Sequence, residues 1–166
     1  MTGGKLLNHV VLLLEVNMKK YLLVTALSVM ALSTANVQAA MPLTDLIGKS
    51  TAFIESKPVM RNAALSTMTM QTYDICVPLI LTLMAGEVRG QVYSNDTANT
   101  FGILWGVLNT WGHAQVARGM PQDVLDRTWQ PYQNESMINQ TAYISKYAQY
   151  CAEAEYKFTR AAGLAR

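Results

Sequence analysis

The sequence predicts an all-α fold, a compact bundle of about four to five helices that follows an N-terminal signal peptide. Three observations support this fold class. Alternating runs of β-branched residues bounded by tight glycine turns, which are typical of hairpins, are absent. Two long apolar segments in the middle of the chain are flanked by residues typical of helix ends. Near the C-terminus a seven-residue repeat predicts a helix that packs along one face.

The segment 18–39 has the three parts of a secretory signal peptide: a basic start, an apolar stretch over 22–32 and a small residue, Ala39, at the cleavage site. The apolar stretch has about half of the ~20 residues that a membrane-spanning helix needs. We therefore expect cleavage after Ala39 and a periplasmic or secreted protein. Because a signal peptide normally lies at the extreme N-terminus, we interpret residues 1–17 as an extension from a mis-assigned start and Met18 as the true start.

The remaining residues, 40–166, suit a single all-α domain. This part of the chain carries ten acidic and ten basic residues, so its formal net charge is zero. Nucleic-acid binding requires a concentrated basic face, and a membrane-surface anchor requires a polybasic cluster. Neither is present in the sequence, so we expect no nucleic acid as a partner and no stable membrane span after cleavage.

Two cysteines, Cys76 and Cys151, lie in this domain. In an oxidising compartment an even pair of cysteines favours a disulfide bond. Because the bond would close a long loop, a chain-entropy model gives it a stabilisation of ~4 kcal/mol. The alternatives are two buried free thiols or a redox pair, although the CxxC spacing typical of redox pairs is absent. We predict a structural disulfide.

The first helix of the domain is expected to begin near Pro42, since Thr44 and Asp45 are typical of a helix start. Pro58 would end this helix or bend the chain. The next helix is predicted over about 73–93. It is apolar on nearly all sides, which indicates a buried central helix. Pro78 fits best in its first turn, and would kink the helix if the helix began earlier.

A second apolar helix is predicted from about Thr97 to Arg118, with cap residues before it and Gly119 as its C-terminal stop. A short helix should follow from Pro121 and end at Pro131. The last helix is predicted over about 134–164. Its inward face carries a seven-residue repeat with a second repeat beside it, formed by Met137, Ile144, Cys151 and Phe158 and by Gln140, Tyr147, Ala154 and Ala161.

Cys151 lies on that repeat and Cys76 lies in the central helix, so both sulfurs are expected to face the core. The sequence also contains two GxxxG patterns, at 86–90 and 102–106. In a membrane this pattern would indicate helix dimerisation. In a domain of this kind we interpret it as a close crossing of neighbouring helices.

Signals for catalysis are weak. His113 is the only histidine of the domain, so a multi-histidine zinc site is excluded, and no HExxH, GxSxG, P-loop or dinucleotide pattern occurs. A general base at His113 would need a nearby acid such as Glu87 or Asp126, and nothing in the sequence fixes their proximity. We predict no catalytic, metal-binding or cofactor-binding residue, and expect His113 at the surface or at a helix cap.

A candidate interaction surface comes from charged and aromatic residues. Tyrosine is enriched at binding hot spots, and helical spacing places three tyrosines on one face. The alternatives are that the tyrosines belong to the core and that the charged residues simply face solvent. The candidate residues are Glu87, Arg89, His113, Tyr143, Tyr147 and Tyr150.

The sequence therefore favours a small exported helical protein whose partner is another protein. This layout, with two cysteines, resembles that of exported immunity proteins against secreted cell-wall amidases, which implies an inhibitor of a secreted toxin. It is also similar to small two-cysteine periplasmic chaperones, although those tend to be shorter and more charged. A structural or accessory subunit of an envelope complex is a further alternative, and an enzyme is less favoured.

Overall fold

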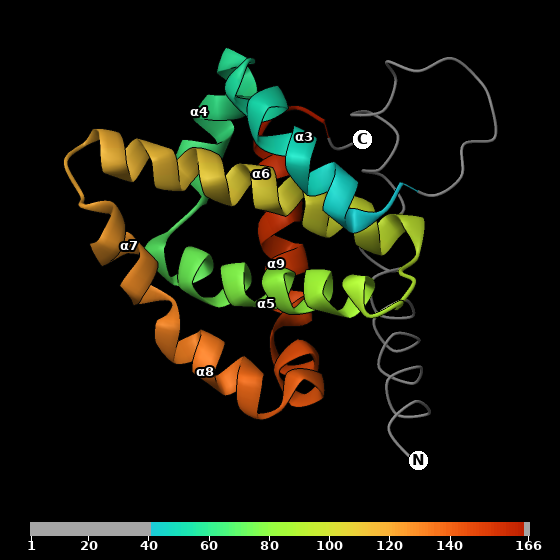
Figure 1. Ribbon diagram of the computed structural model, residues 1–166. Coiled ribbons are helices and arrows are strands. Elements are labelled where there is room, and N and C mark those ends of the chain that lie inside the picture. Colours follow the sequence, from blue (N-terminus) through green and yellow to red (C-terminus); the bar gives the residue numbers. More distant parts are fainter. Residues whose placement is uncertain (1–40, 165–166) are drawn as a thin grey trace, which may run out of the picture.

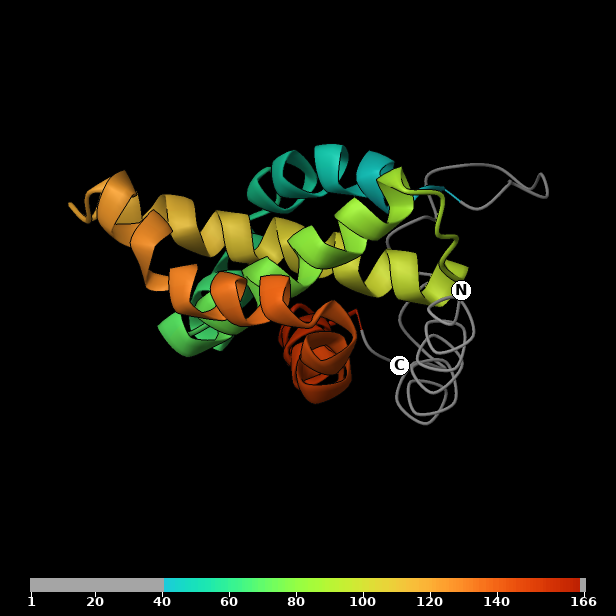
Figure 2. The same cartoon turned by 60° about the horizontal axis from the view of Figure 1, so that its bottom comes forward.

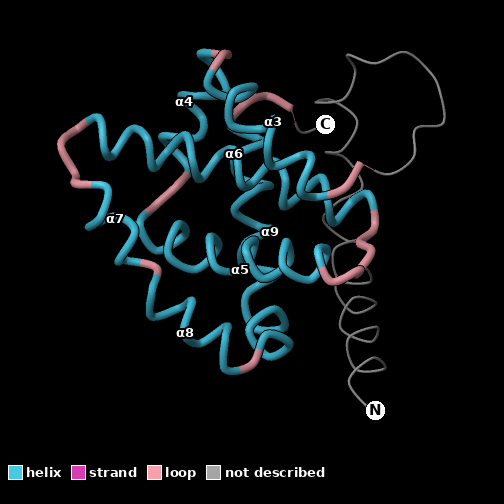
Figure 3. The backbone as a smooth tube through the Cα atoms, viewed as in Figure 1, coloured by secondary structure: helices cyan, strands magenta, loops and turns pink. Residues whose placement is uncertain are grey.

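A computed structural model describes residues 41–164 of the chain, and within them it shows helices and no strand. The predicted signal peptide and residues 1–17 lie outside the described residues. The all-α prediction is confirmed, but the described part contains seven helices instead of four to five (Figures 1 and 3). These are α3 (Leu43–Glu55), α4 (Pro58–Thr67), α5 (Met70–Val88), α6 (Asn95–Ala117), α7 (Gln122–Thr128), α8 (Gln130–Ile138) and α9 (Gln140–Ala161).

Two of the additional helices carry, in their first turn, a proline that was expected to end a helix. Pro58 is the first residue of α4, and Pro131 lies in the first turn of α8. The first turn of a helix makes no use of its N–H groups inside the helix, so the missing N–H of proline costs nothing there. Each proline therefore lies at the start of a second helix instead of ending the chain's helical segment.

The last predicted helix, 134–164, is wrong at its start, because α8 and α9 are separate helices that meet at Asn139. The Asn139 Oδ1 atom accepts a hydrogen bond from the Ala142 N–H at 3.0 Å and so caps α9. Met137, the first member of the predicted repeat, is 70% exposed. Cys151 and Phe158 are buried as expected.

The central helix α5 is shifted towards the N-terminus relative to its prediction. Thr69 caps it by accepting a hydrogen bond from the Thr72 N–H at 3.2 Å. At its other end Gly90 adopts a φ of 90°, which terminates the helix. Pro78 therefore lies in the helix interior instead of the first turn, and its missing N–H leaves the carbonyl of Asp74 without a helical donor.

Helices α5 and α6 run side by side through the middle of the domain (Figure 1). Helix α9 packs against α4, α5, α6 and α8, while α3 lies on the opposite side of α6 (Figure 2). The α3–α6 crossing is close because α6 presents glycines there. A Cβ atom built on Gly106 would lie 2.7 Å from the backbone carbon of Ser50, and one on Gly102 would lie 2.7 Å from the Leu46 Cβ atom.

The second GxxxG pattern therefore marks a helix crossing, as predicted. The first does not, because Gly86 faces the returning loop through Gln91 and Tyr93. Among the described residues no single helix has both the length and the apolarity of a membrane span. Helices α4 and α5 reach that composition only together, and they are bent by 105° relative to each other.

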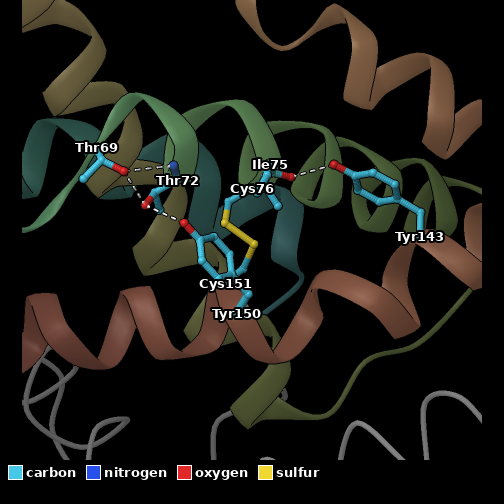
Figure 4. The surroundings of a disulfide bond; sticks show 7 residues. All are labelled: Thr69, Thr72, Ile75, Cys76, Tyr143, Tyr150 and Cys151. Carbon is cyan, nitrogen blue, oxygen red and sulfur yellow. Dashed lines mark hydrogen bonds between the residues drawn. A yellow bond between two sulfur atoms is a disulfide. The ribbon is translucent and has the colours of Figure 1, made fainter.

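The predicted cysteine pair is joined in the core. The sulfur atoms of Cys76 in α5 and Cys151 in α9 lie 2.06 Å apart, and both residues are fully buried (Figure 4). The disulfide bond connects helices 75 residues apart in the sequence. It therefore fixes the C-terminal helix to the centre of the domain.

Candidate interaction surface

Two of the three candidate tyrosines hold α9 against α5. Tyr143 is 1% exposed, and its hydroxyl donates a hydrogen bond to the carbonyl of Ile75 at 2.8 Å. Burial raises the pKa of Tyr143. The half-buried Tyr150 shares a hydrogen bond of 3.2 Å with the hydroxyl of Thr72. Figure 4 shows these two contacts with the disulfide bond between them. Tyr143 therefore belongs to the core in this structure, and its ring is not presented to a partner.

The third candidate, Tyr147, is half-buried in a cluster between α8 and α9. Its ring centre lies 4.7 Å from that of Tyr143 and 6.0 Å from that of Tyr132. Its hydroxyl donates to Glu135 at 3.2 Å. The Lys146 ammonium donates to Glu135 at 2.8 Å and lies 4.6 Å from the centre of the Tyr147 ring. The polar groups of this cluster are thus already paired with one another.

The carboxylate of Glu87 serves the start of α3. Its Oε1 atom accepts a hydrogen bond from the Leu43 N–H at 2.7 Å, and its Oε2 atom accepts one from the Thr44 N–H at 2.8 Å. No side chain of α3 caps this end. A negative charge at a helix N-terminus is favourable because the free N–H groups there carry partial positive charge. Glu87 is therefore a helix cap supplied by another helix.

The other two charged candidates lie at separate places. The Nδ1 atom of His113 lies 2.7 Å from the Glu55 Oε1 atom at the opposite end of α3, and the two side chains are 62% and 37% exposed. Exposed Arg89 donates a hydrogen bond to the Gln140 Oε1 atom at 2.9 Å, which connects the end of α5 to the start of α9. Helix α3, which separates the positions of Glu87 and His113, has 13 residues and is about 20 Å long. The structure therefore does not bring Glu87 and His113 into one site.

Four strongly exposed apolar side chains were missed by sequence reasoning. Val88 and Val92 are 81% and 85% exposed, and Met137 and Ile138 are 70% and 87% exposed. We call these four residues the apolar corner. The hydrogen bond from Arg89 to Gln140 connects its two segments, since Arg89 follows Val88 and Gln140 comes two residues after Ile138. Two further large apolar residues of the described part are exposed, Val59 at 64% and Val124 at 44%.

Two acidic residues were also missed. The half-buried Asp74 has an Oδ1 atom without a hydrogen-bond partner in the described part. Burial raises the pKa of Asp74, and the neighbouring Thr128 side chain partly offsets that rise. Glu155 is 1% exposed, and its Oε1 atom likewise lacks a partner among the described residues. Burial raises the pKa of Glu155 to about 8. The i, i+4 spacing of Glu155 from Cys151 was a signal for its inward direction.

Within residues 41–164, no group of three or more histidine, cysteine, aspartate or glutamate side chains is arranged to hold a metal ion. The chain matches no family model, no curated protein and no solved structure.

Proposed function

We propose that this chain is a small exported protein that binds another protein through the apolar corner. Val88, Val92, Met137 and Ile138 carry this proposal, because all four expose most of their surface. Isolated exposed apolar residues are normal, but a group of them rimmed by polar residues is typical of an interaction site. Arg89 and Gln140 supply polar groups between the two segments of the corner.

The cell envelope is the proposed location. The sequence of residues 18–39 supports export. The bonded pair Cys76–Cys151 is compatible with an oxidising compartment, where such bonds persist. We propose as the specific form an immunity protein that neutralises a toxin delivered to the periplasm. The resemblance in layout to exported immunity proteins supports this form.

Binding is favoured over catalysis because the titratable candidates are used within the fold. Both carboxylate oxygens of Glu87 accept backbone hydrogen bonds, and Glu55 accepts the hydrogen bond available to the Nδ1 atom of His113. Loss of activity towards esters, glycans or peptides in a His113→Ala variant would favour an enzyme instead.

The test is protection of cells that express, in the periplasm, an effector encoded beside this chain. The wild-type protein should restore growth and form a stable complex with the purified effector. Val88→Asp and Ile138→Asp should weaken that complex at least tenfold, since each introduces a charge into an apolar contact. Val59→Asp is the matched control, because Val59 is exposed but lies in α4, and it should bind as the wild type does.

Circular dichroism would first establish that the three variants are folded. Equal weakening by the Val59 and Val88 variants would exclude the corner as the binding surface. Absence of protection against every neighbouring effector would contradict the immunity role.

The same exposed corner is compatible with two alternative roles. A periplasmic stress chaperone would suppress aggregation of several unrelated unfolded proteins, whereas an immunity protein would not. A structural or accessory subunit would co-purify with one envelope complex in the absence of any toxin. Both alternatives predict sensitivity to Ile138→Asp, so the identity of the bound protein distinguishes them.

A further inference from the structure

Glu155 occupies an unusual position for a carboxylate. It lies in α9 one turn after Cys151, and both side chains are buried. Residues four apart share a helix face, so Glu155 lies on the face that contains the disulfide bond. Helix α9 packs against α4, α5, α6 and α8. A carboxylate at this interface is enclosed by the core instead of being solvated.

The Glu155 carboxyl lacks the partners that would stabilise a negative charge. Its Oε1 atom has no hydrogen-bond partner in the described part of the chain. Burial raises its pKa from 4.5 to about 8. None of the charged groups on the helices packed against α9 is hydrogen-bonded or ion-paired to Glu155 in the described part; these are Arg61 in α4, Asp74 and Glu87 in α5, Asp96 and His113 in α6, and Glu135 in α8. On α9 itself the charged neighbours are Glu153, Lys157 and Arg160, and none of them forms a hydrogen bond or ion pair with Glu155.

Burying an ionised carboxylate without a partner is so costly that the group holds its proton instead. We propose that the protonation state of Glu155 controls how tightly α9 packs. The neutral side chain keeps α9 packed, and loss of its proton to solvent loosens α9 from α4 and α6. The disulfide bond to Cys76 would keep α9 attached to α5 in the loosened state. This inference does not depend on the proposed partner.

The direction of the pH effect follows from the two pKa values. In the unfolded chain Glu155 loses its proton near pH 4.5, whereas in the folded domain it retains the proton up to about pH 8. Between these values the folded state binds one proton more than the unfolded state, so stability decreases as pH rises. The contribution is fully present below pH 4.5 and is lost by about pH 8.

The first experiment compares the melting temperature of the full exported chain at pH 5 and pH 8.5. The E155Q variant keeps the side-chain size but has no proton to lose. Its decrease in Tm between the two pH values should be smaller than that of the wild type by on the order of 10 °C. The matched control is E153Q, because Glu153 lies on the same helix with a hydrogen bond to Gln149 at 3.1 Å. E153Q should show the wild-type decrease. Identical pH dependence in the wild type and E155Q would overturn the proposal.

The second experiment locates the loosening. At pH 8.5 the amide hydrogens of α9 after Cys151 should exchange faster in the wild type than in E155Q, while those of α5 should exchange equally. If amide exchange in the wild type were faster by the same factor over the whole domain, this would contradict a loosening confined to α9.

A measurement on the wild type alone does not depend on the folding of any variant. At pH 7 the infrared spectrum should contain a carbonyl band of a protonated carboxylic acid, which disappears as the pH is raised to about 9. Absence of this band at pH 7 would show that Glu155 is ionised and would refute the proposal.

Discussion

At the scale of single residues, polar groups in this domain act mainly between helices. Glu87 caps α3 at one end, and Glu55 at the other end of α3 is bonded to His113. Tyr143 and Tyr150 connect α9 to α5. The polar residues expected to contact a partner thus form hydrogen bonds within the fold instead. The exposed apolar residues are therefore the better candidates for binding.

Glu87→Ala should destabilise the domain by ~1–2 kcal/mol, because it removes both acceptors from the N-terminus of α3. Urea unfolding followed by circular dichroism would measure the loss. Glu87→Gln keeps one acceptor oxygen and should lose about half as much. An unchanged unfolding midpoint in Glu87→Ala would show that water caps α3 equally well.

Tyr143→Phe should cost about 1 kcal/mol, because the buried hydroxyl that donates to Ile75 is lost while the ring remains. The control is Tyr147→Phe. Its hydroxyl is bonded to Glu135 at 3.2 Å in a half-buried cluster, so water can replace the bond and the loss should be smaller. Equal losses measured by urea unfolding would contradict the assignment of Tyr143 to the core and Tyr147 to the periphery.

At the scale of helices, the sequence predicted the apolar centre well and the breaks between helices less well. The two central helices, the stop at Gly119 and the crossing at Gly102 and Gly106 follow from apolar runs and glycine geometry. The separate helices α4 and α8 could not be predicted in this way, because a proline is equally compatible with the end of one helix and the start of the next. Asn139 was overlooked as a cap within an apparently continuous repeat.

Gly106→Ala should destabilise the domain by about 1–3 kcal/mol. The added methyl would lie 2.7 Å from the Ser50 backbone, so α3 would have to move away from α6. This cost exceeds the gain of about 1 kcal/mol expected from replacing a glycine inside a helix. Gly48→Ala is the control, since a Cβ atom at that position in α3 meets nothing within 4 Å. It should stabilise the protein by up to ~1 kcal/mol, and a decrease in Tm for Gly48→Ala would invalidate the comparison.

At the scale of the whole molecule, the candidate site was less predictable than the fold. Helical spacing places Tyr143, Tyr147 and Tyr150 on neighbouring positions, but it does not reveal whether that face meets solvent or another helix. Met137 was assigned to the core because its helix was expected to continue into α9. The break at Asn139 turns that position outward and exposes Met137 and Ile138. Long-range packing therefore decides which residues are available to a partner.

The disulfide bond is the long-range contact with the largest expected contribution. It closes a segment of 75 residues, for which the chain-entropy model gives ~4 kcal/mol. Cys76→Ala together with Cys151→Ala should therefore lower the urea midpoint strongly. A reductant that reaches the buried bond should lower the midpoint of the wild type by a similar amount and leave the double variant unchanged. An effect of reductant on the double variant would show that it acts elsewhere. Equal midpoints of the oxidised wild type and the double variant would mean that packing of α9 on α5 is sufficient without the bond.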